Sequence, residues 1–223
     1  MNQVAIVTGG TSGIGKATAL ALKASGCTVY EFSRRAQGVD GLHHIAADVT
    51  SEDSVRAAVA QVMDAEGRID ILVNNAGFGY DARFVESDMA RQRELILTND
   101  LALVELVGEF APDMAERKCG GILNVASVAG FMPGPDMATY YASKAFVQSF
   151  SQAIHVELRR AGVHVSTLCP GPVRTAFWEN ADAAHTPISR IALDAPFVAS
   201  EGFNALCRNK ALCIPGALAK TIV

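Results

Sequence analysis

The stretch that decides the fold is Thr8-Gly9-Gly10-Thr11-Ser12-Gly13-Ile14-Gly15. It follows the apolar run Val4–Val7, which predicts a buried strand, and it leads directly into a helix-compatible segment over Gly15–Ser25. Glycines permit a tight turn and a close approach to the backbone, and the N–H groups at a helix N-terminus bind phosphate. The turn therefore predicts a pyrophosphate site. Its Gly-x-x-x-Gly-x-Gly spacing departs from the G-x-G-x-x-G of the commonest dinucleotide folds, so a turn without a ligand is the alternative.

The rest of the chain alternates between short apolar runs and stretches of helical period, which predicts a parallel sheet covered by helices. The predicted fold class is α/β, a single-domain Rossmann-like doubly wound parallel sheet flanked by helices on both faces. We expect strands over Val4–Val7, Thr28–Phe32, His43–Ala47, Ile69–Val73, Gly121–Ala126 and Val163–Leu168, and helices over Gly15–Ser25, Ser51–Glu66, Glu86–Lys118 and Tyr140–Arg160.

Length and composition narrow the class of protein. The 223 residues are 50% hydrophobic and 19% charged, which predicts one compact domain, and the net charge of -4 lacks the basic excess of nucleic-acid binding. No apolar run approaches roughly 18 residues and no signal peptide is expected, so we predict no membrane partner. Five cysteines without a CxxC pair indicate reduced thiols in the cytoplasm. The histidines show no metal-ligand spacing, so no metal is expected.

The end of the second predicted strand bears on which dinucleotide binds. Folds that prefer NAD usually carry an acid there, which binds the ribose hydroxyls. Here Ser33 stands at the tip, followed by Arg34 and Arg35, and a small hydroxyl beside guanidinium groups suits a 2′-phosphate. This favours NADP(H). NAD(H) stays open because Glu31 lies on the same strand face and is an acid within reach of a ribose, and a solvated loop is the alternative for the arginines.

Tyr140 and Lys144 stand four residues apart on the last predicted helix, so both project from one face. A phenol with an ordinary pKa of about 10 is a poor acid or base at neutral pH, and a neighbouring ammonium favours its ionised form. Tyr140 is therefore a candidate general acid or base. Ser127 ends the preceding strand, which places a hydroxyl at the carboxyl edge of the sheet, on the same side as the glycine turn.

Together these residues resemble the short-chain dehydrogenase/reductase family in its compact single-domain form. The resemblance implies one NAD(P)-binding Rossmann-fold domain over residues 1–223, in which 1–175 form the cofactor and catalytic core and 176–223 supply a substrate flap, a last helix and a last strand. It runs from Val4 to about Thr175 on motifs in the family's order: Thr8-Gly9-x-x-x-Gly13-x-Gly15, Asp48-Val49, Asn74-Asn75-Ala76-Gly77, Asn99, Ser127, Tyr140-x-x-x-Lys144 and Pro170-Gly171.

The resemblance implies four catalytic roles. Tyr140 exchanges a proton with the substrate oxygen, and Ser127 hydrogen-bonds that same oxygen. Lys144 lowers the pKa of Tyr140 and binds the nicotinamide ribose. Asn99 holds a water that links Lys144 to bulk solvent, while the nicotinamide carries the hydride.

For the cofactor, the resemblance implies that Asp48 accepts from the adenine amino group and that Val49 supports the ring. Asn74 is expected to tie neighbouring strands together instead of touching a ligand. The predicted cofactor-binding residues are Gly9, Thr11, Ser12, Gly13, Ile14, Gly15, Ser33, Arg34, Arg35, Asp48, Val49, Asn75, Ala76, Gly77, Tyr140, Lys144, Pro170, Gly171, Val173 and Thr175.

The C-terminal part departs from the family. Family members commonly end with a strand and a glycine pair that help to build a tetramer, whereas here a short strand over Ala211–Ile214 precedes Pro215-Gly216. We expect a homodimer through the helices Glu86–Lys118 and Tyr140–Arg160, and the tetramer stays open. The small and aromatic stripe of the second helix fits packing on the sheet as well as a subunit interface.

The irregular stretch Pro172–Pro196 is either a flap over the site or a plain surface loop. Together, Ala129–Thr139 and Leu168–Thr175 resemble a bacterial oxidoreductase group of mostly unassigned substrates. In that group five residues would line an apolar pocket: Met132, Pro133, Met137, Phe177 and Trp178.

We therefore expect an NADP(H)-dependent oxidoreductase that interconverts a carbonyl (a ketone or aldehyde) and an alcohol on a small molecule with a hydrophobic part. One alternative is a catalytically silent dinucleotide-sensing or scaffold protein, although such proteins tend to lose the serine, tyrosine or lysine that are all present here. Another is a nucleotide-sugar epimerase or dehydratase, a class that usually needs a longer chain with a substrate domain.

Overall fold

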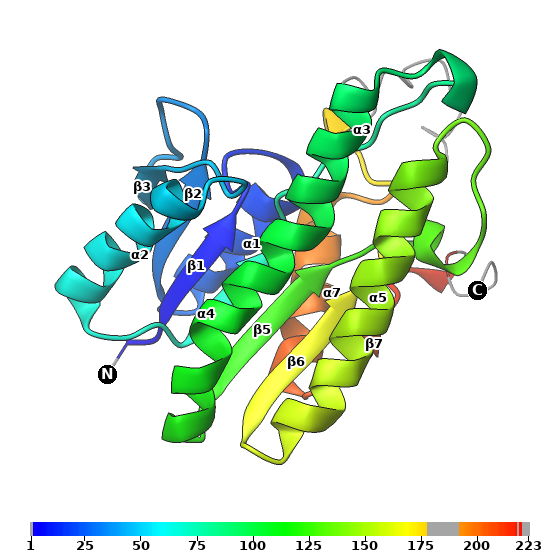
Figure 1. Cartoon of the computed structure of the whole chain (residues 1–223). Coiled ribbons are helices and arrows are strands. Elements are labelled where there is room, and N and C mark those ends of the chain that lie inside the picture. The colour runs from blue at the N-terminus through cyan, green and yellow to red at the C-terminus, as the bar shows by residue number, and fades with distance from the viewer. Residues whose placement is uncertain (1, 178–191, 218, 220–223) are drawn as a thin grey trace.

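A parallel sheet forms the centre of the molecule. In the computed structural model, which describes residues 2–177, 192–217 and 219, the strands lie in the order β3-β2-β1-β4-β5-β6-β7 (Figure 1). Every neighbouring pair is parallel, which confirms the predicted α/β fold class. The strands are β1 Val4–Thr8, β2 Thr28–Ser33, β3 His43–Ala46, β4 Ile71–Asn74, β5 Gly120–Val125, β6 Val163–Leu168 and β7 Leu212–Cys213.

Helices cover both faces of the sheet, and each face has its own apolar core. Helices α2, α4 and α5 cover one face and α1 and α7 cover the other (Figure 1). Val62, Leu106 and Val147 belong to the core on the first face, and Leu22 and Leu206 belong to the core on the second. Strands buried on both sides explain why their central residues read as continuous apolar runs. The helices are α1 Gly13–Ala24, α2 Glu52–Glu66, α3 Met89–Ile96, α4 Ala102–Arg117, α5 Ala138–Arg159 and α7 Ala195–Cys207.

The long helix expected over Glu86–Lys118 begins at Met89 and ends at Arg117, and it is not α-helical throughout. A π-helical segment over Leu97–Leu101 separates α3 from α4. Its Asn99 is 1% exposed, accepts a hydrogen bond from the Phe78 N–H (3.0 Å) and donates to the Phe78 carbonyl oxygen (3.0 Å). Apolar periodicity cannot reveal such a widening, because it depends on a polar side chain that turns inward to bind another segment.

The order of the strands reverses beside β1, since β2 follows it on one side and β4 on the other. Open α/β sheets bind ligands outside the carboxyl ends of the strands at such a point. Asn74 at the end of β4 donates to Asn124 Oδ1 (2.9 Å), and Asn124 Nδ2 donates to Ser151 Oγ on α5 (2.9 Å). This confirms that Asn74 ties neighbouring strands together.

The expected flap over Pro172–Pro196 lies mostly outside the described residues, and Trp178 lies outside them as well. Its two described ends are joined. Val173 pairs with Leu193 as an isolated parallel bridge, and Arg174 Nη1 contacts Asp194 Oδ1 at 2.7 Å. The chain thus leaves the sheet edge and returns to it at neighbouring points.

Candidate active site

A cavity of about 440 Å³ opens at the carboxyl edge of the sheet, next to the glycine turn. Most of the predicted site residues line it: Gly9, Ser12, Gly13, Ile14, Asn75, Ala76, Gly77, Ser127, Tyr140, Lys144, Pro170, Gly171, Val173 and Thr175. Thr11 and Arg35 line a second pocket instead. Six predicted residues are in neither lining: Gly15, Ser33, Arg34, Asp48, Val49 and Asn99.

The glycine turn is braced from β4. Thr8 Oγ1 accepts hydrogen bonds from the N–H groups of Asn75 and Ala76 (both 3.0 Å), and Asn75 Nδ2 donates to the Thr8 carbonyl oxygen (3.0 Å). A Cβ added at Gly15 would collide with the Asn75 side chain, so this position must be glycine. The Asn75 side chain therefore serves the turn itself, a structural role that the family motif did not imply.

The N-terminus of α1 faces the cavity. Ser12 is the N-cap residue of the helix, but its side chain makes no capping hydrogen bond. The first N–H groups of a helix have no partner within the helix, and they attract anions. The turn and the helix start therefore have the chemistry of a phosphate cradle.

Tyr140 and Ser127 both line the cavity, where Ser127 Oγ accepts a hydrogen bond from the Ala129 N–H (3.1 Å). Burial raises the pKa of Tyr140 to about 12, and the neighbouring Ser127 hydroxyl opposes this shift. The expected lowering of this pKa by Lys144 stays a prediction, because burial sets the direction of the shift here. The Lys144 ammonium donates to the Val125 carbonyl oxygen (3.0 Å) and lies 5.8 Å from the centre of the Tyr140 ring, too far to outweigh burial.

Lys144 is itself buried, and desolvation lowers its pKa to about 8. The main charge that opposes this shift is Asp100, which the sequence analysis did not single out. Burial raises the pKa of Asp100 to about 7, while the Lys144 ammonium lowers it. Its Oδ1 is buried with no hydrogen-bond partner among the described residues. The feature of the sequence that could have identified Asp100 is its position as an acid directly after Asn99, in a largely apolar stretch.

Asn99 lies behind the cavity and is held by protein groups. Besides its two bonds to the backbone of Phe78, its Nδ2 donates to Ser143 Oγ (3.1 Å). Both hydrogens of the Asn99 side-chain amide therefore already have acceptors. The expected water between Asn99 and Lys144 stays a prediction, and it would have to donate to an oxygen of Asn99.

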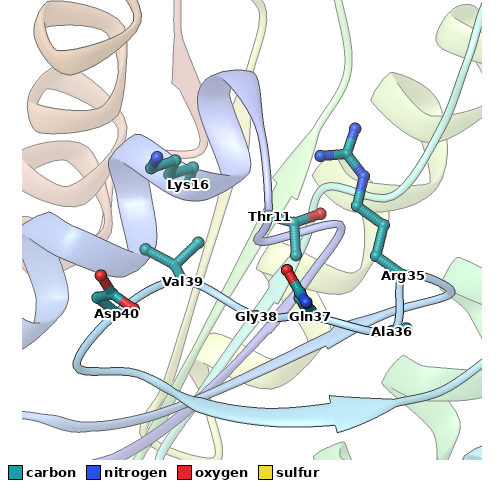
Figure 2. Close-up of a pocket in the computed structure, with 8 residues that line it drawn as sticks. All are labelled: Thr11, Lys16, Arg35, Ala36, Gln37, Gly38, Val39 and Asp40. Carbon is teal, nitrogen blue, oxygen red and sulfur yellow. The ribbon is translucent and has the colours of Figure 1, made fainter.

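The second pocket has a volume of about 640 Å³ and lies beyond the glycine turn, between α1 and the loop that follows β2 (Figure 2). In Figure 2, Thr11 is seen between Lys16 on α1 and Arg35 on the loop. Lys16 was not among the predicted site residues. Two cations and a hydroxyl around an open pocket suit an anionic group.

Two predicted cofactor residues have protein partners. Arg34 Nη1 contacts Glu94 Oε1 on α3 at 3.1 Å. Asp48 Oδ1 accepts from the N–H and the hydroxyl of Thr50; burial raises the pKa of Asp48, but these bonds and nearby Arg34 bring it below its ordinary value. Ser33 is buried, and its hydroxyl oxygen has no hydrogen-bond partner among the described residues.

The other end of the main cavity is apolar. Of the predicted pocket residues, Met132, Met137 and Phe177 line it, whereas Pro133 does not. Phe177 packs against Tyr140 with ring centres 5.4 Å apart. The lining also includes Phe78 and Tyr141, which were not predicted as site residues because neither belongs to a motif.

Comparison with known proteins places this site in a family. The family model described as short chain dehydrogenase matches residues 3–186. A 3-ketodihydrosphingosine reductase of Bacteroides thetaiotaomicron is 34% identical over 182 residues, which are 80% of this chain and 66%, slightly under two thirds, of that protein.

Solved structures agree with this result. A short-chain dehydrogenase from Sphingobium yanoikuyae in complex with NADPH has a TM-score of 0.84 and 28% identity, over 96% of this chain and 88% of that one. A 3-ketoacyl-(acyl-carrier-protein) reductase from Brucella melitensis complexed with NADH has a TM-score of 0.86 and 26% identity, over 96% of both chains.

The fold and the site thus define a dinucleotide-binding oxidoreductase of the Rossmann type. The chain belongs to the short-chain dehydrogenase/reductase family, whose members act on carbonyl and alcohol groups with a nicotinamide cofactor. Within the described residues, no helix is long and apolar enough to cross a membrane. Nor do the described histidines, cysteines and acids gather into a group of three that could hold a metal.

Proposed function

We propose that this protein is an NADP(H)-dependent oxidoreductase that interconverts a carbonyl group and an alcohol, with Tyr140 as the general acid and base. The observation that carries the proposal is the convergence of Ser127, Tyr140 and Lys144 on the cavity that the glycine turn also lines. These groups come from β5, α5 and the turn after β1, so the fold brings them together from distant parts of the chain.

The residues fit a dinucleotide. The turn and the start of α1 have the form of a phosphate cradle, close packing of Gly15 against Asn75 holds the turn in place, and the nicotinamide would supply a hydride when bound. The Tyr140 phenol donates its proton to the substrate oxygen, and the Ser127 hydroxyl hydrogen-bonds that oxygen as charge develops. Because a phenol with a pKa of about 12 is protonated at neutral pH, Tyr140 supports the reduction of a carbonyl.

Lys144 has two proposed roles. Its ammonium is close enough to the cavity to bind the ribose next to the nicotinamide, and it places a positive charge behind Tyr140 once that residue has given up its proton. Asn99 is proposed to hold the water through which a proton returns to this pair. The apolar residues beside Tyr140 favour a substrate with a hydrophobic part, as in the ketoacyl and ketosphingoid substrates of the relatives.

The preference for NADP(H) over NAD(H) is supported by Lys16, Thr11 and Arg35 around the second pocket. Glu31, the acid that kept NAD(H) open, is 0% exposed and is paired with His44, so it does not reach the surface where a ribose would lie. We propose that residues 1–175 hold the cofactor and the catalytic groups, and that 176–223 shape the substrate site.

We also propose that two copies associate through α4 and α5. The proposal is supported by two apolar side chains on neighbouring elements, since Leu101, just before α4, is 46% exposed and Phe146 on α5 is 45% exposed. We further propose that the protein is cytoplasmic. This location is supported by the cysteines, since all five lie in the described part of the chain and none forms a disulfide.

The test is the replacement of Tyr140 by phenylalanine, which removes one oxygen atom and keeps the ring. Turnover of a carbonyl substrate with NADPH should fall by about 10²–10⁴-fold or more, while NADPH binding stays within a few-fold of wild type. Tyr141→Phe is the matched control, because Tyr141 lines the same cavity without the spacing to Lys144. If Tyr140→Phe turns over at the wild-type rate, Tyr140 is not the acid.

The silent dinucleotide-sensing alternative makes a different prediction. Such a protein would bind NADPH but would reduce no member of a panel of ketones, aldehydes and ketoacyl thioesters, and Tyr140→Phe would change nothing. The observation that favours an enzyme is that the Ser127 hydroxyl, the Tyr140 phenol and the Lys144 ammonium are all present at one cavity.

A further inference from the structure

A buried acid lies beneath the second pocket. The Glu31 side chain on β2 is 0% exposed, and its Oε1 is paired with His44 Nδ1 on β3. The two residues are direct partners in the register of the parallel strands. The glycine turn lies close by, since a Cβ at Gly10 would be 2.6 Å from Glu31 Cβ. The pair therefore sits between the sheet and the segments that line the pocket.

His44 also holds the loop that carries Arg35. Its Nε2 lies 3.0 Å from the Arg35 carbonyl oxygen. A carbonyl oxygen only accepts, so Nε2 carries a hydrogen and Nδ1 faces the carboxyl group of Glu31 through a shared proton. Glu31, His44 and the Arg35 carbonyl thus form one chain of hydrogen bonds from the sheet to the loop.

The loop makes room for this chain and has few other ties. Residues 34–38 are exposed, and a Cβ at Gly38 would collide with His44 Cβ and lie 3.0 Å from Glu31 Oε1. Within the described residues, the backbone bond of the loop is Leu42 N–H to the Val39 carbonyl oxygen (3.0 Å). The Arg34–Glu94 ion pair also ties this loop to α3, but His44 makes the hydrogen bond to the backbone of Arg35 itself.

Stability alone does not explain a fully buried acid paired with a half-buried histidine. Taking a carboxylate and an imidazole out of water is unfavourable, and apolar side chains of similar size usually serve a core as well or better. Glu31 Oε2 is also buried with no hydrogen-bond partner among the described residues. Such a pair is retained when it fixes one arrangement of the groups it binds.

We propose that Glu31 and His44 are positioning residues that hold Arg35 at the pocket that Lys16 also lines, and thereby set the preference for a 2′-phosphorylated dinucleotide. This inference rests on the proposed use of NADP(H). Neither residue touches the cofactor. Their effect passes through the backbone of Arg35, which lines the pocket on the other side of Thr11 from Lys16 (Figure 2).

The test compares Glu31→Leu/His44→Leu with Glu31→Gln. The double variant replaces the pair by apolar side chains that keep the core filled, so it should fold, but it has no link to the loop. The amide that Glu31→Gln introduces can donate to His44 Nδ1 while Nε2 still donates to Arg35, so this variant keeps the link without the charge. Affinities for NADPH and NADH are measured by fluorescence titration, and amide hydrogen exchange is followed in residues 34–41 without nucleotide.

In the double variant we expect the ratio of NADPH to NADH affinity to fall about tenfold, with NADH affinity unchanged, and residues 34–41 to exchange faster. Glu31→Gln should stay close to wild type in both measurements. A purely structural pair would weaken both nucleotides together and leave their ratio unchanged. That result, or a double variant with wild-type discrimination, overturns the inference.

The wild-type protein separates this inference from the function on which it rests. If the wild type shows no preference for NADPH, the NADP(H) proposal fails together with the role of the pair in discrimination. If the wild type prefers NADPH and the double variant keeps that preference, only the role of Glu31 and His44 is wrong. If the wild type prefers NADPH, the double variant loses this preference and Glu31→Gln keeps it, then both the NADP(H) proposal and the role of the pair are supported.

Discussion

At the scale of single residues, burial shifts the pKa values of the two proposed catalytic residues, Tyr140 and Lys144, in opposite directions. It raises the pKa of Tyr140 to about 12 and lowers that of Lys144 to about 8. Both shifts favour the uncharged form of each residue. At neutral pH both residues keep their protons, so a proton that Tyr140 is proposed to give up would leave a negative charge that the Lys144 ammonium balances.

Asp100 makes stability depend on pH. Its pKa in the folded protein, about 7, is above its ordinary value of 3.8, so the folded state binds more protons between these values. Its contribution to stability is therefore fully present below about pH 4 and is lost as pH rises through 7. Asp100→Asn should flatten the fall of Tm between pH 4 and 8, as measured by thermal unfolding. Asp64→Asn, on the exposed face of α2, should keep the wild-type profile; if both variants keep it, Asp100 titrates normally.

The two arginines after β2 should differ in effect. Arg35 lines the second pocket, whereas Arg34 is paired with Glu94. Arg35→Ala should weaken NADPH binding by about tenfold or more and leave NADH binding unchanged, because a guanidinium makes charge-assisted bonds to phosphate. Arg34→Ala should change NADPH binding much less. The reverse order in fluorescence titrations would mean that Arg34 leaves Glu94 to bind the phosphate.

At the scale of elements, one hydroxyl joins β1 to β4. Thr8 Oγ1 accepts from two backbone N–H groups and donates to the Val73 carbonyl oxygen (3.3 Å). Thr8→Val keeps the shape but leaves those N–H groups without a partner, so the free energy of unfolding should fall by ~1–3 kcal/mol in urea titrations. Thr18→Val is the matched control, since Thr18 is equally buried but bonds only within its own helix. Equal losses in both variants would remove the special role of Thr8.

The elements themselves could largely be predicted from sequence. The strands Thr28–Phe32 and Val163–Leu168 were placed to within a residue, because strands buried on both faces are short apolar runs between turns. The π-helical segment before α4 could not be predicted, since its Asn99 binds the backbone of Phe78, 21 residues away. Helix α7 was expected without bounds, because the stretch before it has no periodicity.

The candidate site was predictable where the family motifs lie and not where pairs form across the fold. The Tyr140-x-x-x-Lys144 spacing was enough to bring both residues to the cavity. The partners of Glu31 and Arg34 were not foreseen, because His44 and Glu94 lie on other elements and the sequence alone does not say which residues meet. Nor does the sequence alone indicate that Phe78 lines the cavity.

At the scale of the whole molecule, the exposed apolar residues on and beside α4 and α5 predict self-association. Leu101→Asp/Phe146→Asp should shift the protein from dimer to monomer in sedimentation velocity, since charges in a buried interface are unfavourable. Phe84→Asp is the control, because Phe84 is also exposed but lies on a separate turn, Phe84–Glu86. A dimer that survives the double change must use another surface.

The bridge between Val173 and Leu193 has a consequence for how such a protein can evolve. Because the chain departs and rejoins at neighbouring points, the segment between them is a closed insertion in the frame. Doubling the length of such an insertion adds only ~0.6 kcal/mol of closure entropy. The part of the chain proposed to shape the substrate site can therefore change in length at little cost to the stability of the sheet that carries it.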